Sequence, residues 1–320
     1  MKTYVFPFLL LIALLASCKD DISLPDTGSG VKLVIYCFPS TRDTTYISVS
    51  RSLPVRQYKN GVKIEDIDDA QITYTVNGQY REVTNRGKGI YYVVGKQKTG
   101  DKIALTVSSD NLPTASAETS IPDTIALSDP KSRQTKVYNE DREEMLGYEQ
   151  VMATFSDPSE TKDYYAVRVL LKKVSVRNSA GDSYTQSFYY PIINTKNEPL
   201  LVSKTNIDDA FGFSDNYYGG LCIFDDAGIS GGSYTFHLNV YNNNKLWHDD
   251  YRAKEYERVE LLHLTPEYYK FLFSINAEEN SDLAQYGLSQ LMPTATNVKG
   301  GLGAVAGWNV SRTAWIKSNR

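Results

Sequence analysis

Apolar and polar residues alternate along many short segments of the chain, which is the pattern of β-strands with one buried face. In the segment 71–77, Ile72, Tyr74 and Val76 fall on one face, and Asn77-Gly78 then forms the dipeptide most typical of a tight hairpin turn. Similar patterns predict further strands, and the full set after position 31 covers 32–38, 44–51, 71–77, 79–84, 90–94, 102–108 and 115–121. This series of short strands predicts a β-sandwich.

The order of these segments is similar to that of immunoglobulin-like and transthyretin-like sandwiches, because a Gly-x-Tyr-Tyr strand start, a Gly-Asp turn and an alternating strand follow one another. We therefore expect such a sandwich at 31–125. Pro122 and Pro130 interrupt the pattern and mark a boundary. A larger β-rich domain is expected at 126–320, with strands at 150–155, 163–176, 184–193, 219–224, 233–241 and 258–264. The predicted fold class is all-β.

One helix is predicted in the second domain, near 265–280. Thr265 is a suitable N-cap, Pro266 suits the first helical position, and Glu267 places an acid near the positive end of the helix dipole. Tyr268 and Leu272 then recur at helical spacing, which predicts that this face packs on a sheet. The glycine-rich segment after the helix predicts a bend that leads into one or two closing strands.

The first 17 residues have the features of a secretion signal: a basic start and an apolar run shorter than the roughly 20 residues that span a bilayer. The residues that end at Cys18 resemble the bacterial lipoprotein box, which implies that Cys18 carries lipid and becomes the new N-terminus. Lys19, Asp20 and Asp21 resemble the signal that exports Bacteroidota lipoproteins to the cell surface. Residues 18–30 are expected to be a flexible tether. We expect a lipid-anchored outer-membrane protein that faces the cell exterior.

The composition of the chain limits which ligands and partners are expected. A formal net charge of −4 lacks the basic excess that binds phosphate backbones, so nucleic acid is not an expected partner. The 3 histidines occur in no zinc-binding spacing, and no histidine metal site is expected. Cys37 and Cys222 lie in apolar strand-like segments and are expected to be buried thiols. Export leaves a disulfide between them open as an alternative.

Several acidic turns offer the oxygen ligands that Ca²⁺ prefers. They are Asp66, Asp68 and Asp69, with the pairs Asp208-Asp209, Asp225-Asp226 and Asp249-Asp250. None has the spacing of a helical calcium loop, so solvated turns are the expected state, with one structural Ca²⁺ as the alternative. We expect no other cofactor. A carboxylate pair for glycoside hydrolysis is a further, less favoured interpretation. No Gly-x-Ser-x-Gly elbow occurs, and no catalytic residue is assigned.

Two other features are candidates for contact or modification. The segment around Phe211, Phe213, Tyr217 and Tyr218 concentrates aromatic rings in a Gly- and Asp-rich loop, and exposed aromatic rings commonly anchor ligands or partners. This loop is therefore the expected ligand or partner surface. Thr124 follows an aspartate and precedes an isoleucine, which resembles the O-glycosylation acceptor of Bacteroidota.

Five segments carry a wider resemblance: LVIYCF, DAQITYTVNG, GGSYTFHLNVYN, LTPEYYKFL and NVKGGLGAVAGW. Together with the lipoprotein box, they resemble the domain of unknown function 4249 family of Bacteroidota surface lipoproteins. The resemblance implies a non-enzymatic accessory or substrate-binding partner of a TonB-dependent nutrient transporter and its associated lipoproteins. It carries no established catalytic residues. A fimbrillin-like structural or adhesive protein that assembles by strand addition is the main alternative. A glycoside or peptide hydrolase is less favoured.

Overall fold

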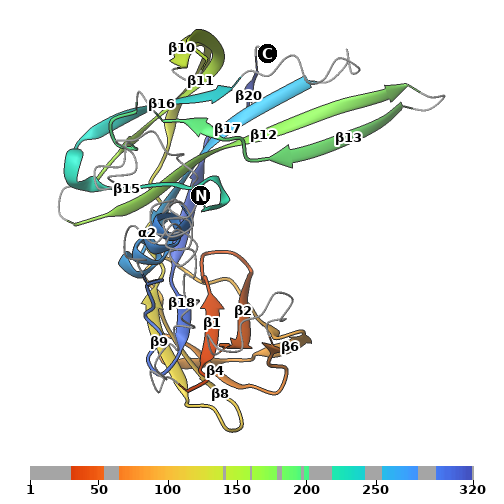
Figure 1. Ribbon diagram of the computed structural model, residues 1–320, viewed down its shortest axis with the longest axis vertical. Helices are drawn as coiled ribbons and strands as arrows, with labels where there is room; N and C mark the ends of the chain where they lie inside the picture. The colour runs from red at the N-terminus through yellow and green to blue at the C-terminus, as the bar shows by residue number, and fades with distance from the viewer. Residues whose placement is uncertain are drawn as a thin grey trace, which may run out of the picture. The chain divides into compact units, whose positions relative to one another are not determined.

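The computed structural model describes residues 30–53, 65–139, 142–158, 161–178, 182–195, 198–201, 218–241, 254–279 and 293–318. Within it, Val31–Arg320 form one compact unit. The described residues are mostly strands, arranged in several sheets with one packed helix (Figure 1). The expected all-β fold class is confirmed. The expected lipid attachment and export residues, Cys18 to Asp21, lie outside the described residues.

The first β-rich part consists of two sheets. One has the strand order β18-β1-β2-β7-β6, with β3 added to β2, and the other has the order β5-β4-β8-β9. The first sheet contains β1 (Leu33–Cys37), β2 (Thr44–Arg51), β3 (Glu65–Asp66), β6 (Thr84–Gly87), β7 (Ile90–Val94) and β18 (Leu302–Val305). The second contains β4 (Gln71–Val76), β5 (Gln79–Arg81), β8 (Lys102–Ser108) and β9 (Ala115–Ser120). All strands predicted here are present, whereas the short polar strands β3 and β6 were not predicted.

The alternating apolar residues of the first β-rich part form its hydrophobic core, as expected. Leu33, Ile35, Tyr74 and Leu105 point inward from their strands and are almost completely buried. The hydroxyl of Tyr74 accepts a hydrogen bond from Nε2 of the buried Gln97 at 2.8 Å, which supplies the polar neighbour that a buried tyrosine needs. The predicted hairpin is confirmed, because both residues of the Asn77-Gly78 turn have positive φ.

The second β-rich part also consists of two sheets. Their orders are β10-β11-β16-β14 and β13-β12-β17-β19, with β15 added to β12 and β20 added to β17. The strands of the first are β10 (Ser128–Asn139), β11 (Glu144–Ser156), β14 (Ile193–Asn194) and β16 (Ser233–Tyr241). Those of the second are β12 (Tyr164–Asn178), β13 (Asp182–Tyr189), β15 (Cys222–Asp225), β17 (Lys254–Leu264), β19 (Trp308–Arg312) and β20 (Ile316–Lys317). Rings of Phe155, Tyr165, Phe224 and Phe236 pack between them.

Strand β10 differs from the sequence prediction, which placed Pro130 in a break between domains. Pro130 instead lies inside β10, where the pairing register with β11 shifts between Ser128 and Lys131. Asp129 has a φ of 50°, so the interruption is a β-bulge in a continuing strand. The strand was missed because most of its side chains are polar and exposed, and they give no apolar alternation.

The C-terminal tail joins both β-rich parts. Strand β18 pairs in parallel with β1, and Val298 and Val305 belong to the first core. A few residues later, β19 pairs with β17 of the second part. The tail thus contains the closing strands that its sequence predicted, but in two different sheets. The expected division into two domains at residue 125 stays a prediction. The tail supplies strands to the β-rich parts on both sides of that residue.

Helix α2 (Pro266–Glu279) begins at the predicted residue. The carbonyl oxygen of Thr265 accepts a hydrogen bond from the backbone N–H of Tyr269. Thr265 is therefore the N-cap residue, as predicted, but its buried Oγ1 has no hydrogen-bond partner among the described residues and does not cap the helix. Leu272 packs with Ala166, Leu262 and other apolar side chains of the sheet, as expected of this face. In the described part of the chain, no helix combines the length and the apolar character that a membrane span requires.

The two cysteines of the sheets are free thiols. Cys37 lies in β1 and Cys222 in β15, and both are buried, which confirms the expected state. The two side chains belong to different apolar cores. Burial raises the pKa of the Cys37 thiol well above its usual range, so this thiol stays protonated and is a poor nucleophile.

Candidate functional site

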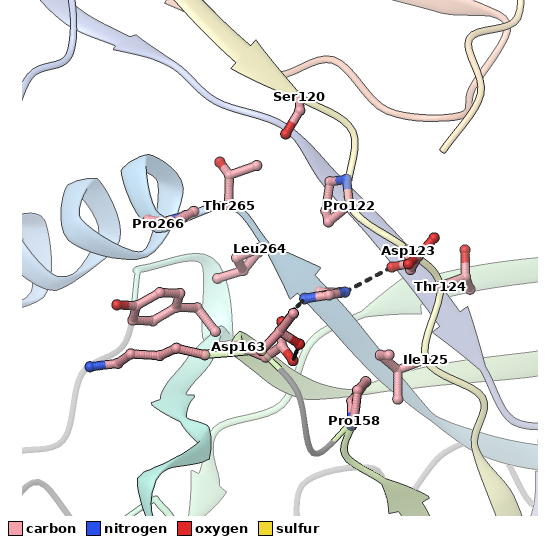
Figure 2. A pocket seen from close by; sticks show the side chains of 14 residues that line it. Ser120, Pro122, Asp123, Thr124, Ile125, Pro158, Asp163, Leu264, Thr265 and Pro266 are labelled. Carbon is pink, nitrogen blue, oxygen red and sulfur yellow. Dashed lines mark hydrogen bonds and ion pairs between the residues drawn. The ribbon is translucent and has the colours of Figure 1, made fainter. Parts of the chain in front are cut away.

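A pocket of about 810 Å³ lies where the segment after β9 passes the start of β12 and the end of β17 (Figure 2). Ser120 and the segment from Pro122 to Ile125 form one wall, and the start of α2 with Asp163 and Tyr164 forms another. The predicted modification residue Thr124 lines this pocket and is exposed, so its hydroxyl is accessible to solvent. Polar side chains of three separate segments therefore meet here.

His263 connects these segments. Its Nδ1 lies 2.9 Å from the carbonyl oxygen of Asp123, and its Nε2 lies 3.1 Å from Oδ1 of Asp163. Both partner atoms are hydrogen-bond acceptors, whereas a neutral imidazole has only one N–H. Both ring nitrogens are thus in contact with oxygen atoms of other segments, and Nε2 lies within ion-pair distance of the Asp163 carboxylate. His263 therefore acts as a link between the segment after β9 and the sheet of β12 and β17.

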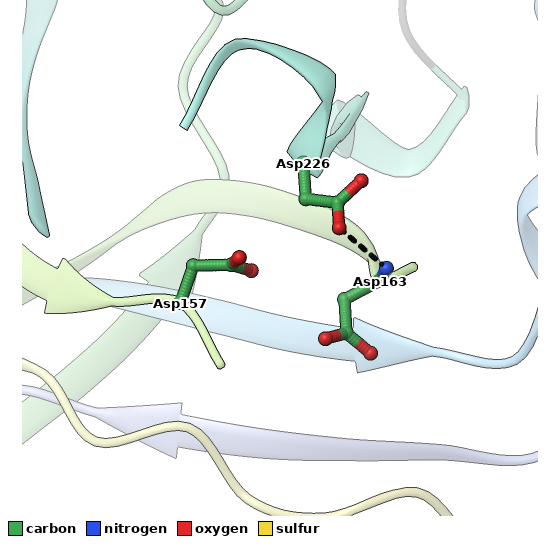
Figure 3. A group of neighbouring side chains, drawn as sticks. All are labelled: Asp157, Asp163 and Asp226. Carbon is green, nitrogen blue, oxygen red and sulfur yellow. Dashed lines mark hydrogen bonds between the residues drawn. The ribbon is translucent and has the colours of Figure 1, made fainter. Parts of the chain in front are cut away.

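Asp163 also belongs to a buried group of three carboxylates, with Asp157 and Asp226 (Figure 3). One carboxylate oxygen from each residue lies within 4.8 Å of the others. The three residues come from the end of β11, the start of β12 and the 3-10 turn η4 (Asp226–Gly228). Sequence analysis singled out Asp226, but Asp157 and Asp163 were missed because each lies alone in its own segment.

Hydrogen bonds from the chain already hold each of these carboxylates. Asp157 accepts from the Tyr165 hydroxyl at 2.6 Å and from the backbone N–H of Gly231 at 3.0 Å. Asp226 accepts from the backbone N–H of Asp163 at 3.0 Å. Burial raises the pKa of Tyr165, and its hydrogen bond to Asp157 raises it further, so Tyr165 remains a donor. The three carboxylates thus hold together the ends of separate segments of the chain. Binding of Ca²⁺ at this group stays a hypothesis.

A second buried acid, Glu198, was not found from the sequence. Its carboxylate accepts hydrogen bonds from the Tyr234 hydroxyl and, at 2.6 Å, from the backbone N–H of His237. The residue is 1% exposed. Burial raises the pKa of Glu198 to about 7, and the bond from His237 opposes this shift in part. A lone glutamate beside a loop gives no sequence signal of such burial.

This raised pKa predicts a pH-dependent stability. Unfolded Glu198 ionises near pH 4.3, whereas folded Glu198 stays protonated to about pH 7, so its contribution is full below pH 4.3 and is lost as the pH rises to 7. The loss is roughly 4 kcal/mol. In urea unfolding, Glu198→Gln is expected to gain about this much relative to wild type between pH 4.5 and 8. Glu118→Gln, at an exposed position of β9, is the control. Equal pH profiles for wild type and Glu198→Gln would contradict the prediction.

The sheet of β12, β17 and β19 carries a cluster of charges around Glu260 on its outer face. Arg168, Glu260 and Arg312 lie side by side on β12, β17 and β19. Arg168, Arg258 and Arg312 all form ion pairs with Glu260, at 2.8 to 3.0 Å. Burial alone would raise the pKa of Glu260, but the hydrogen bonds and charges of the arginines outweigh this effect and lower it. One ionised carboxylate is thus shared by three guanidinium groups.

Aromatic rings cover the cations of this face. The guanidinium of Arg168 lies 3.9 Å from the ring centre of Tyr190. Trp315 lies 4.5 Å from both the Arg258 guanidinium and the Lys172 ammonium. Such cation–π contacts hold the charged groups in place. The side chains of Arg168, Arg258 and Arg312 are 15%, 22% and 35% exposed. We define the cationic face as Arg168, Lys172, Arg258 and Arg312 with the rings of Tyr190 and Trp315.

The structure places part of the predicted aromatic loop. Tyr218 is half-exposed in the short turn η3 (Tyr218–Gly220), and its backbone N–H donates to Oδ1 of Asn276 in α2 at 2.9 Å. Phe211, Phe213 and Tyr217 lie outside the described residues. The grouping of these four rings therefore stays a prediction, and the cationic face was not predicted at all.

The predicted acidic turns have separate structural roles. Asp66, Asp68 and Asp69 are exposed, and Oδ1 of Asp68 accepts a hydrogen bond from the backbone N–H of Gly89. Asp225 caps η4 by accepting from the backbone N–H of Ala227. The pairs at 208–209 and 249–250 lie outside the described residues. Among the described turns, only the one at Asp226 contributes to the group of three carboxylates.

Sheets, cores and pocket together define an all-β protein with two β-rich cores and one packed helix. The family model described as Domain of unknown function (DUF4249) matches residues 20–314. The chain therefore belongs to this family, and the resemblance seen in its motifs is confirmed. Among curated proteins, the comparison finds no match.

Proposed function

We propose that this protein is a non-enzymatic lipoprotein of the outer membrane that faces the cell exterior and works by contact, as an accessory or substrate-binding partner of a TonB-dependent nutrient transporter. A lipid on Cys18 holds it at the membrane. The order of signal segment, lipoprotein box and export residues supports this location. Membership of the family supports the transporter as the partner, through the role that the resemblance implies.

The observation that carries the non-enzymatic part is the state of His263 and Asp163 at the pocket and of the two carboxylates grouped with Asp163. Both ring nitrogens of His263 are engaged by the chain, as are carboxylate oxygens of Asp157, Asp163 and Asp226. A general base needs a nitrogen or oxygen that is free to take a proton from a substrate. These groups instead join segments of the fold, which favours a rigid contact protein over a hydrolase.

One feature speaks against the fimbrillin-like alternative. Assembly by strand addition requires an open sheet edge or groove that receives the strand of another subunit. Beside β1, that place is occupied by β18 of the same chain, through a parallel ladder from Val34 to Cys37. Two glycines of the tail, Gly301 and Gly303, lie so close to the first sheet that no larger side chain fits.

Affinity purification of the full lipoprotein from outer membranes in mild detergent tests the proposed partner. We expect one TonB-dependent transporter barrel to be recovered in a fixed ratio to the lipoprotein, and chemical cross-links to connect the two. A lipoprotein of unrelated sequence with the same lipid anchor serves as the control for recovery through shared micelles. Repeated recovery of the protein alone, without cross-links to a barrel, would contradict the proposal.

A further inference from the structure

We propose that the cationic face binds an anionic polysaccharide, a chain of sugars that bear carboxylate or sulfate groups. The site lies on the outer side of β12, β17 and β19. It does not involve the pocket at His263. The inference depends neither on the lipid at Cys18 nor on a transporter, because it rests only on the side chains of this sheet.

The first observation is an excess of positive charge fixed by strand register. Directly paired residues of antiparallel strands lie on the same face of a sheet. Between the row of Arg168 and the row of Val174, this face carries six basic residues and one carboxylate, that of Glu260. The basic residues are Arg168, Lys172, Lys254, Arg258, Arg312 and Lys317. The excess attracts a ligand with several negative charges.

The second observation is how these charges are neutralised. Glu260 is 1% exposed and is shared by three arginines, so the cluster keeps a net positive charge. Lys172 contacts the rings of Tyr256 and Trp315, and no carboxylate forms an ion pair with it in the described part of the chain. Guanidinium and ammonium groups held in this way bind carboxylate and sulfate oxygens without rearrangement.

The third observation is the spacing. Basic residues recur four positions apart along two neighbouring strands, at Arg168 and Lys172 and at Lys254 and Arg258. Four residues of a strand span roughly 13 Å, and neighbouring strands lie about 4.8 Å apart. The result is an array of repeated positive charge. A polymer that repeats its negative charge can occupy several of these positions at once, which raises its overall affinity.

The aromatic side chains favour sugars over an acidic peptide. Phe188 and Tyr190 are 54% and 44% exposed, and they border the array beside Trp315. Half-exposed rings offer flat apolar surfaces on which the C–H faces of sugar rings stack. A peptide would instead require pockets for its apolar side chains. The aliphatic residue in the middle of the array, Leu170, is buried and offers no such pocket.

Binding of full-length protein in mild detergent to immobilised polygalacturonate tests the proposal, with neutral dextran and poly-L-glutamate as comparison ligands. We expect binding to polygalacturonate that weakens as the salt concentration rises. Lys172→Ala and Trp315→Ala are each expected to raise the Kd about fivefold, which corresponds to the loss of one charged or stacking contact. Neither residue pairs with Glu260, so both variants keep every side chain of the ion cluster, although Trp315→Ala also removes the ring that contacts Arg258.

Lys136→Ala is the matched control, because it removes the same charge from an exposed position on β10. Its Kd is expected to equal that of wild type. Melting curves identify variants that do not fold, and Lys172→Gln, which keeps much of the side-chain stem, then replaces Lys172→Ala. The proposal is overturned by equal binding to neutral dextran or by an equal loss in Lys136→Ala. Tighter binding to poly-L-glutamate than to polygalacturonate would assign the face to an acidic protein and would also overturn it.

Discussion

Replacing Gly303 with alanine is expected to destabilise the protein by roughly 3–5 kcal/mol. Gly303 lies in β18 with a φ of +94°, a backbone conformation that residues with a side chain rarely adopt. An added Cβ would also overlap the backbone carbonyl of Ile35 in the neighbouring β1. In Gly303→Ala, backbone strain and the overlap with Ile35 occur together. A shift of the backbone that relieved either of them would separate β18 from β1.

Urea unfolding of the two proteins measures this effect. Gly78→Ala is the matched control, since Gly78 has a φ of +78° in its hairpin turn but open space around the added Cβ. It is expected to cost about 1 kcal/mol, from backbone strain alone. The difference between the two variants isolates the overlap with β1. Equal losses in both would show that β18 does not pack against β1 as closely as described.

Replacing Cys18 with serine is expected to move the protein from the membrane fraction to the soluble fraction. The hydroxyl of serine is no substitute for the thiol that would carry the proposed lipid, and several acyl chains on one residue bind a bilayer far more firmly than a single reversible one. Removing them therefore changes the location of nearly all molecules. Fractionation of cells, with metabolic labelling by a fatty acid, measures both the location and the lipid.

Cys222→Ala provides the control for this experiment. Cys222 is a buried cysteine in β15, so the variant loses a thiol but keeps Cys18, the proposed lipidation residue. It is expected to stay in the membrane fraction and to incorporate the labelled fatty acid. If Cys18→Ser fractionates with the membrane as wild type does, the proposed anchor is wrong.

The strands of this protein could be predicted largely because their apolar residues alternate. The apolar residues around Ile35, Tyr74 and Leu238 occupy every second position and are buried, and all lie in strands near the predicted bounds. Strand β10 could not be found in this way, since its partner β11 supplies the apolar residues while its own side chains are mostly polar and exposed. Backbone pairing, which leaves no trace in composition, holds β10 in place.

The candidate sites were harder to predict, because each depends on residues far apart in the sequence. Asp157, Asp163 and Asp226 meet only through the pairing of β12 with β15 and the turn that follows. The cationic face depends on register: Arg168 lies beside Glu260 in this pairing, and a shift by one residue would turn that side chain to the other face. The periodicity of the sequence shows which side chains share one face of a strand. The register between strands that are distant in the sequence depends on how the complete domain packs.

The position of β18 determines when this protein can finish folding. A chain that leaves the ribosome or an export channel with its N-terminus first presents the edge of β1 long before Leu302–Val305 arrive to cover it. During this interval, the exposed backbone groups and the incomplete apolar core are available to other chains. A late part of the polypeptide therefore completes the sheet that an early part begins.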